Sequence, residues 1–276
     1  MIHQMAPWVP TFIQSTKNNT QPFLPFQIAT TDELTNTPRC RTVVFRDFLF
    51  KDKKSNVLTF NTDIRSGKIK ESFPNGLDTT APIEACFYFP ETMEQYRLRG
   101  SCFLVSKKTS NISKKIVEKY GIVSPGVSGH HKEDLYKYED EVNEAMGIEN
   151  TNATTGENNA AKGSVIRPPT TTEWQMEIRR QWYSLSRTSR SQYRKPDPGK
   201  PITSETSEKL DKIQRGVDGT DENAGLENFA LVCLCIDKVD YLNLKNGSGG
   251  ERLIFTRTAD EDANDLENWI EEHVCP

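Results

Sequence analysis

The sequence lacks any uninterrupted run of about 20 apolar residues, the length that an α-helix needs to cross a bilayer. Residues 1–14 have neither a basic start nor a long apolar stretch, so they do not resemble a signal peptide. Positive charge is also scarce, with 35 lysines and arginines against 39 aspartates and glutamates. General nucleic-acid binders are usually basic. We therefore expect a cytoplasmic protein, with the nucleus as a further compartment, that binds neither membrane nor nucleic acid.

Paired metal-ligand motifs and the common nucleotide-binding loops are missing as well. Among the six cysteines, Cys233 and Cys235 are two positions apart, and no second cysteine or histidine pair completes a zinc pattern. We interpret them as two core residues and predict no metal site. The sequence contains neither a Walker loop nor a Gly-x-Gly-x-x-Gly fingerprint. An anionic ligand must therefore be held by local positive charge.

The sequence does contain closely spaced strand signals. Several segments are rich in β-branched and aromatic residues and are joined by short polar connections: 41–50, 57–62, 82–90, 95–106, 228–244 and 251–257. Helical patterns are fewer, at 63–73, at 171–186 and, with its apolar side chains inward, at 260–274. This spacing favours an antiparallel barrel or sandwich over alternating βαβ units.

Two polar stretches interrupt this pattern. Residues 108–170 are rich in lysine, glutamate and asparagine, and their low-complexity part, 150–164, is predicted to be disordered. Residues 200–225 are predicted to form a long polar loop. We predict a single domain over residues 1–276, in which both stretches are insertions.

The residues with the clearest chemical potential lie between positions 41 and 68. Arg41 and Arg46 bracket an apolar strand and, being five positions apart, should face opposite sides of it. The next strand ends in a group of polar and basic side chains, namely Asn61, Thr62, Arg65, Ser66 and Lys68. Hydroxyls and cations at the start of a helix favour a phosphate. The alternative is an ordinary capped helix with a solvated basic face and two exposed arginines.

Four segments in this order carry a resemblance to a known family: RTVVFR (41–46), LTFNTDIRSGK (58–68), EACFYFPETMEQYRLRG (84–100) and WYSLSRTSRSQYRKPDPGKP (182–201). Together they resemble the pyridoxamine 5′-phosphate oxidase-like family, and within it a eukaryotic and cyanobacterial branch without an assigned substrate. The resemblance covers about 25–106, 171–200 and 228–257. It implies a mainly β fold with helices, a six-stranded antiparallel split barrel, and a homodimer with FMN at its interface.

The resemblance also implies cofactor-binding residues. FMN would lie along Arg41, Thr42, Val43, Val44 and Arg46, beside Asn61 and Thr62, with its phosphate near Ser66 and Lys68. Gly67 replaces an arginine of the family's phosphate loop, and we predict that Arg65 supplies the missing charge. Gln95 matches a glutamine that contacts FMN, often from the other subunit. Arg252 matches an arginine over the flavin and substrate.

The substrate side departs further from the family pattern. Tyr183, Arg187 and Ser191 match a family trio that holds the substrate phosphate, and a helix would place all three on one face. The alternative is an ordinary polar helix end, in which Arg190 or Arg194 would serve as well. Leu242 replaces a tryptophan, and Ile254 replaces a histidine.

These features predict a flavin-dependent oxidoreductase that acts on a B6 vitamer or related small molecule, with a phosphorylated substrate as one candidate. Flavin chemistry belongs to the cofactor, while the protein supplies position and charge. The alternatives are a non-catalytic module that binds or senses flavin, and an interaction protein that has lost the cofactor.

Overall fold

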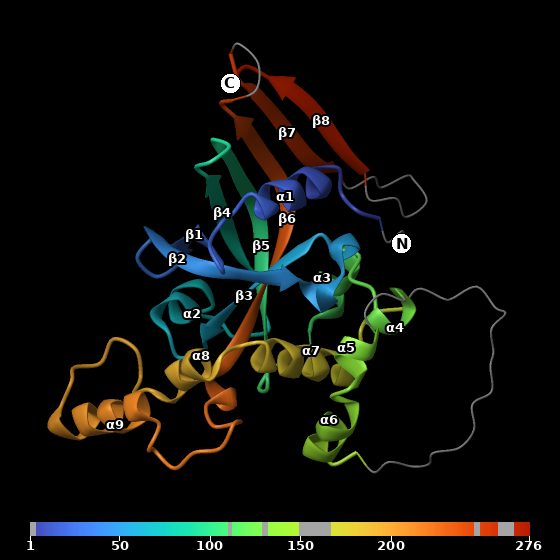
Figure 1. Cartoon of the computed structure of the whole chain (residues 1–276). Helices are drawn as coiled ribbons and strands as arrows, with labels where there is room; N and C mark the ends of the chain where they lie inside the picture. Colours follow the sequence, from blue (N-terminus) through green and yellow to red (C-terminus); the bar gives the residue numbers. More distant parts are fainter. Residues whose placement is uncertain (1–3, 110–111, 129–131, 149–166, 246–248, 259–267) are drawn as a thin grey trace, which may run out of the picture.

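The computed structural model describes residues 4–109, 112–128, 132–148, 167–245, 249–258 and 268–276. The described strands form one antiparallel sheet in the order β3-β2-β1-β4-β5-β6-β7-β8, and β3 pairs in addition with β6. This additional pairing closes the first six strands of the chain into the predicted barrel (Figure 1). The strands are β1 (Leu24–Asp32), β2 (Thr37–Phe48), β3 (Val57–Asp63), β4 (Ala81–Phe89), β5 (Glu94–Ser106), β6 (Phe229–Asn243), β7 (Glu251–Thr258) and β8 (Asn268–Val274).

Aromatic side chains fill much of the barrel interior. Phe26 and Phe87 stack with their ring centroids 4.2 Å apart. Helix α1 (Trp8–Lys17) packs into the same core, where the Phe12 ring lies edge-on to Phe87 at 5.0 Å and to Tyr96 at 5.3 Å. Neither α1 nor β1 is among the predicted elements. Helix α1 is short and has a proline in its first turn, so tertiary burial of its apolar face must provide most of its stability.

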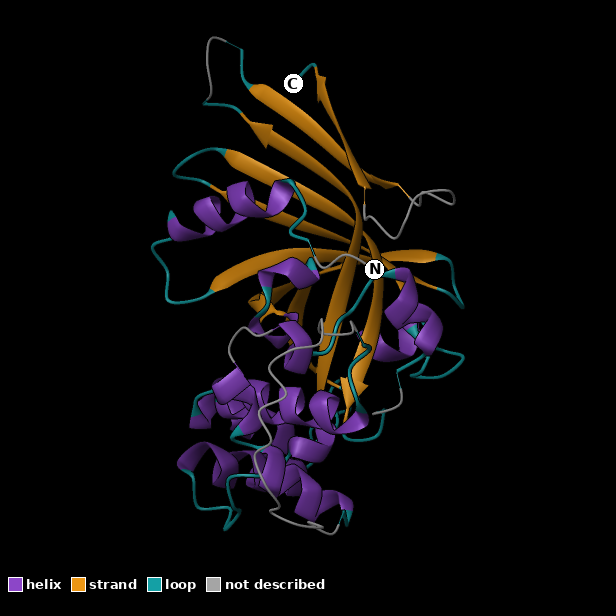
Figure 2. Cartoon of the chain, turned by 90° about the vertical axis from the view of Figure 1, so that its right-hand side faces the viewer, coloured by secondary structure: helices purple, strands orange, loops and turns teal. Residues whose placement is uncertain are grey.

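A second apolar core lies outside the barrel, under helix α7 (Thr171–Tyr183). Trp174, Ile178 and Trp182 of α7 are buried there against outward side chains of β3, β5 and β6. This confirms the predicted helical spacing, although the helix ends three residues earlier than expected. Figure 2 shows most of the helices gathered at one end of the barrel.

Strand β6 connects the barrel to the last two strands. Its first part pairs with β3, from Phe229 to Cys235, and its last part pairs with β7, from Lys238 to Asn243. Between these parts the register with β5 shifts at Gly100. Only glycine fits at this position, because a Cβ atom there would lie 1.9 Å from the carbonyl oxygen of Cys235. Such a bulge bends a strand, so β7 and β8 extend beyond the barrel (Figure 1).

Short helices make up most of the remaining described chain: α2 (Gly67–Ser72), α3 (Lys114–Lys119), α4 (Pro125–Ser128), α5 (Lys132–Tyr136), α6 (Glu139–Met146), α8 (Arg187–Ser191), α9 (Ser204–Arg215), η1 (Leu49–Lys51), η2 (Lys53–Ser55), η3 (Gln192–Arg194) and η4 (Leu226–Asn228). None of the helices described combines the length and apolarity that a bilayer crossing requires.

Two predicted segments differ in the structure. Residues 200–225, predicted as a loop, contain α9, which has a reciprocal threonine cap at its start. Residues 260–274, predicted as a helix, contain β8, which pairs with the edge of β7. The free edge of β7 offers hydrogen bonds to a further strand, and a local helical period does not reveal this pairing. The polar stretch 108–170 holds α3 to α6, whereas all of 150–164 lies outside the described residues.

Glu173 joins part of this polar stretch to α7. It forms a capping box with Thr170 at the start of the helix. Its buried carboxylate also accepts hydrogen bonds from Ser124 Oγ at 2.6 Å, Tyr136 Oη at 2.8 Å and the Arg167 guanidinium at 2.9 Å. Burial by itself would raise the pKa of Glu173, but these hydrogen bonds outweigh it and bring the pKa to about 2.

Glu173→Gln should remove stability in a pH-dependent way. The carboxyl has an ordinary pKa of 4.5, so its stabilisation is complete above that pH and is lost as the pH falls toward 2. We expect the variant to lose about 3 kcal/mol at most near neutral pH, and the difference from wild type to vanish at the acid end. Denaturant unfolding followed by tryptophan fluorescence measures this. Glu205→Gln, at an exposed position of α9, is the control, and a pH-independent difference would contradict the assignment.

Candidate functional site

The β2–β3 hairpin divides the predicted site residues between two faces. Arg41 pairs with Ile28, and Thr62 pairs with Ala230, and both of these partners belong to the barrel core. Arg41 and Thr62 therefore lie on the inner face, at the end of the barrel. Asn61 pairs with Leu231, which belongs to the outer apolar cluster. Successive strand residues face opposite sides, so the hairpin presents an inner and an outer group.

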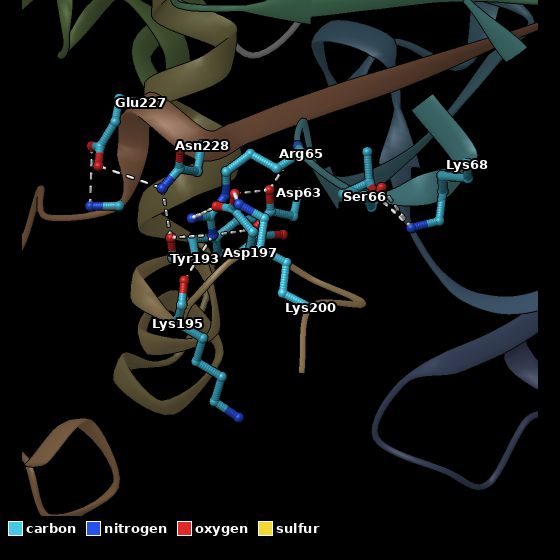
Figure 3. A network of polar contacts seen from close by, with 12 residues as sticks. Asp63, Arg65, Ser66, Lys68, Tyr193, Lys195, Asp197, Lys200, Glu227 and Asn228 are labelled. Atoms are coloured by element: carbon cyan, nitrogen blue, oxygen red, sulfur yellow. Dashed lines mark hydrogen bonds and ion pairs between the residues drawn. The ribbon is translucent and has the colours of Figure 1, made fainter. Parts of the chain in front are cut away.

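The inner group is built around Lys68. Its Nζ donates hydrogen bonds to Thr62 Oγ1 at 2.9 Å and to Ser66 Oγ at 3.1 Å, and the two hydroxyl oxygens are 3.4 Å apart. Ser66 occupies the N-cap position of α2, yet its hydroxyl makes no capping hydrogen bond to the helix. Figure 3 shows Ser66 and Lys68 turned toward each other. Two hydroxyls and an ammonium group thus meet at the turn after β3.

The charges around Lys68 are unbalanced. Burial lowers the pKa of Lys68, and the positive charge of Arg41 lowers it further, while Asp63 and Glu71 act in the opposite direction. Arg41 itself forms an ion pair with Glu71. Within the described part of the chain, no carboxylate lies within ion-pair distance of the Lys68 ammonium. A partly buried cation beside a second cation favours an added anion.

Arg65 points away from this group, which corrects the prediction that it supplies the missing charge. Its guanidinium pairs with Asp63 at 2.7 Å and with Asp197 at 3.1 Å. It also donates to the carbonyl oxygens of Tyr193 at 3.2 Å and Lys195 at 3.0 Å. In Figure 3 this network is separate from Ser66 and Lys68. Arg65 therefore holds the chain after α8 against the end of β3.

The outer group contains polar atoms that lack protein partners. Both the nitrogen and the oxygen of the Asn61 amide are buried, and neither has a hydrogen bond among the residues described. Arg46 is exposed and, over the same part of the chain, makes no ion pair or hydrogen bond. Of the other predicted strand residues, Thr42 is exposed, Val44 is half-buried and Val43 packs against the barrel core. A buried amide without a partner is costly, so Asn61 is a candidate contact for a ligand or another chain.

Gln95 and Arg252 lie on a different side of the barrel. Gln95 pairs with Leu242, and Leu242 pairs with Arg252, so the three form one outward row across β5, β6 and β7. Arg252 is held by Asp240 at 2.8 Å. Around the closed barrel, β5 is three strands from β2 in either direction. Gln95 therefore cannot meet the outer face of the hairpin within one chain.

The predicted trio of Tyr183, Arg187 and Ser191 does not share one helical face, contrary to expectation. Tyr183 is the last residue of α7, and α8 starts a new helix at Arg187, where the Ser186 side chain caps the free N–H of Ser189. A serine cap favours a new start over continuation of the preceding helix. The three residues are four positions apart in the sequence, but they do not lie on one continuous helix as this spacing suggested.

The three side chains also have separate environments. The Tyr183 hydroxyl is hydrogen-bonded with Glu141 at 3.1 Å and Asn223 at 2.9 Å. Arg187 is 88% exposed, and Ser191 donates to a backbone carbonyl of its own helix. Arg187 and Ser191, but not Tyr183, line a pocket of about 880 Å³ between α8, η3 and α9. Arg190 and Arg194, the alternatives weighed for this helix, line it too.

Tyr193 lies near Arg46 and is a residue that the predictions omit. It lies in η3, directly after the trio, and the positive charge of Arg46 acts on its phenol. The signal in the sequence was its position two residues after Ser191. Tyr193 is held near Arg46 by the hydrogen bonds of Arg65, which connect segments 128 to 132 positions apart. No local sequence pattern predicts contacts over such a separation.

Known proteins resemble the chain in both sequence and fold. Residues 5–106 match the family model described as pyridoxamine 5′-phosphate oxidase, FMN-binding domain. The uncharacterized protein YGR017W of Saccharomyces cerevisiae is 52% identical, with the whole of both chains covered. Pyridoxine/pyridoxamine 5′-phosphate oxidase 2 of Arabidopsis thaliana is 26% identical over 88% of this chain and 83% of that protein.

Two solved structures share the fold. A pyridoxamine 5′-phosphate oxidase-related, FMN binding protein of Nostoc punctiforme has a TM-score of 0.59 and 23% identity, with all of both chains covered. PhzG of Burkholderia lata, solved with tetrahydrophenazine-1-carboxylic acid, has a TM-score of 0.51 and 11% identity over 99% of this chain and 98% of that one. With its closed split barrel and these relatives, the chain belongs to the pyridoxamine 5′-phosphate oxidase-like family of FMN-binding proteins.

Proposed function

We propose that this protein binds FMN and acts as a flavin-dependent oxidoreductase on a B6 vitamer or a related small molecule. The observation that carries the proposal is the Lys68 ammonium, which is partly buried beside Arg41 and has no carboxylate partner among the described residues. Arg41 is already paired with Glu71, so a phosphate would balance chiefly Lys68, and it would accept hydrogen bonds from Lys68, Thr62 and Ser66.

The donors present fit such a group. Gly67 offers no side chain where the family has an arginine, but Arg41 supplies a second positive charge on the same inner face. The unpartnered amide of Asn61 lies one residue before Thr62 on the opposite face of β3. A ligand that passes around the end of β3 could therefore use both groups. When bound, FMN supplies the hydride-accepting ring, and the protein supplies position and charge.

We also infer a homodimer. The outward row of Gln95, Leu242 and Arg252 is opposite β2 within one barrel. Strands β1 and β4 lie between β2 and β5. A two-fold axis that passes near β1 and β4 would therefore place the row of Gln95, Leu242 and Arg252 of one chain over the β2–β3 hairpin of the other. Such an interface is self-complementary and produces two equal sites.

For the substrate, the pocket beside α8 is the candidate. Arg187, Arg190 and Ser191 line it, and these cationic and hydroxyl side chains support a small anionic ligand. A second candidate function, a flavin-binding module without turnover, is favoured by the apolar side chains of Leu242 and Ile254. Neither can donate a hydrogen bond or transfer a proton in place of the family's tryptophan and histidine.

Lys68→Met should weaken FMN binding roughly 10-fold to 100-fold, because it removes one charge-assisted hydrogen bond to the phosphate. Riboflavin, which has the same ring without phosphate, should bind the variant and the wild type equally. Quenching of flavin fluorescence measures both affinities. Lys70→Met, at an exposed position on α2, is the matched control. Equal FMN affinity in the Lys68 variant and the wild type would refute the phosphate assignment.

Mixing two defective chains should restore binding if each site is shared between subunits. Co-expressed Lys68→Met and Gln95→Leu chains form heterodimers in which one site carries both defects and the other carries none. We expect each heterodimer to bind one FMN with wild-type affinity. If the mixture binds no better than the two parent variants, each site belongs to a single chain.

Incubation with pyridoxamine 5′-phosphate distinguishes turnover from binding alone. An oxidase should form the aldehyde, measured by its absorbance, and hydrogen peroxide in equal amounts. Arg187→Ala should raise KM, because it weakens binding of the substrate phosphate. A protein that holds FMN but forms neither product from pyridoxamine or pyridoxine phosphates would be the non-catalytic module.

A further inference from the structure

Tyr193 combines a fixed position with an unused hydroxyl group. Its carbonyl oxygen accepts hydrogen bonds from Arg65 at 3.2 Å and from the Asn228 amide at 2.8 Å. Its ring packs against Trp182 at 5.6 Å and Phe229 at 5.2 Å, between ring centroids. Backbone and ring are therefore held from several sides, and the side chain is only 8% exposed.

The Tyr193 hydroxyl has no hydrogen-bond partner among the residues that the structure describes. Burial raises the pKa of Tyr193, while the positive charge of Arg46 opposes this. The phenol thus remains protonated at neutral pH and is available as a donor. The hydroxyl oxygen of this firmly held residue still reaches solvent, so it can donate to a ligand that replaces water there.

Two polar neighbours of Tyr193, Asn61 and Arg46, also have no hydrogen-bond partner within the described ranges of the chain. Phe229, on which the ring packs, pairs with Asp63, and the next outward pair along the strands is Leu231 with Asn61. Asn61 is thus one outward position from the place that Tyr193 covers, and both atoms of its amide are unpartnered. Arg46 completes the set from β2. Three elements, β2, β3 and η3, therefore bring unused hydrogen-bonding groups to one outer face of the hairpin.

We propose that Tyr193 is a positioning residue of the flavin site, whose hydroxyl donates to the ring of the bound cofactor beside Asn61 and Arg46. This inference rests on the proposed function. It assigns the inner group around Lys68 to the phosphate and the outer group around Tyr193 to the isoalloxazine.

The chemistry of the ring matches this set of groups. The pyrimidine side of isoalloxazine carries two carbonyl acceptors on either side of an N–H donor. The Asn61 amide offers one donor and one acceptor, and Tyr193 and Arg46 offer donors. A phosphate, by contrast, only accepts when ionised, so it would leave the Asn61 oxygen without a donor.

The experiment compares two ligands and two variants. Purified wild type, Tyr193→Phe and Lys68→Met are each titrated with FMN and with riboflavin, following flavin fluorescence. Tyr193→Phe keeps the ring packing and should weaken both ligands by the same factor, roughly threefold to tenfold. Lys68→Met should weaken FMN alone. Tyr120→Phe, which removes a hydroxyl bonded to Lys119 and Asp237, is the control for loss of a tyrosine hydroxyl.

The visible absorption band of bound flavin gives a second readout, because loss of a hydrogen bond to the ring should shift the band in Tyr193→Phe and not in Tyr120→Phe. If Tyr193→Phe binds both ligands as the wild type does, or loses affinity for FMN alone, the inference is overturned. If Tyr193→Phe does not fold, Asn61→Leu takes its place: equal weakening of both ligands supports the ring-side placement, and no weakening overturns it. Failure of the wild type to bind either flavin would instead reject the proposed function.

Discussion

Pairing of β3 with β6 is the constraint on which the rest of the structure depends. It runs through seven residues of β3, from Val57 to Asp63, and turns an open sheet into a closed barrel. Closure removes two edges that would otherwise need covering. It also fixes the hairpin of β2 and β3 opposite β5. The separation between the hairpin residues and the row of Gln95, Leu242 and Arg252 within one chain therefore follows from closure of the barrel.

Two buried carboxylates of the described chain show how polar groups are usually satisfied in this fold. Glu94 accepts hydrogen bonds from Ser15 at 2.9 Å and Tyr241 at 2.8 Å, inside the barrel core. Glu177, fully buried beneath α7, pairs with Arg180 at 2.7 Å. Among the described residues, the indole nitrogens of Trp8 and Trp269 are also buried without a hydrogen bond, but Asn61 is the side chain in which both a donor and an acceptor lack one. Such exceptions in native proteins commonly mark a binding site.

The sequence predicted six of the eight described strands, because β-branched and aromatic runs separated by polar turns are a local signal, and it missed β1 and β8. It also predicted that Arg41 and Arg46 face opposite sides, since alternation is a property of the strand itself. Tertiary contacts were beyond its reach. The direction of Arg65 depends on Asp197 and on two carbonyls more than a hundred residues away. A single serine cap, Ser186, marks the break between α7 and α8. The spacing of four between the residues of the predicted trio suggested one continuous helix instead.

Arg65 has a consequence for how this protein can change. Through it, the chain after α8 is fastened by its backbone to the same strand end that carries Thr62 and Ser66. The fastening uses main-chain carbonyls, so it is indifferent to which side chains α8 displays. Substitutions in α8 and α9 can thus reshape the neighbouring pocket while its placement relative to Lys68 is preserved. The strand end that carries Lys68 and its hydroxyl neighbours is thus held in place, while the side chains of α8 and α9 can vary.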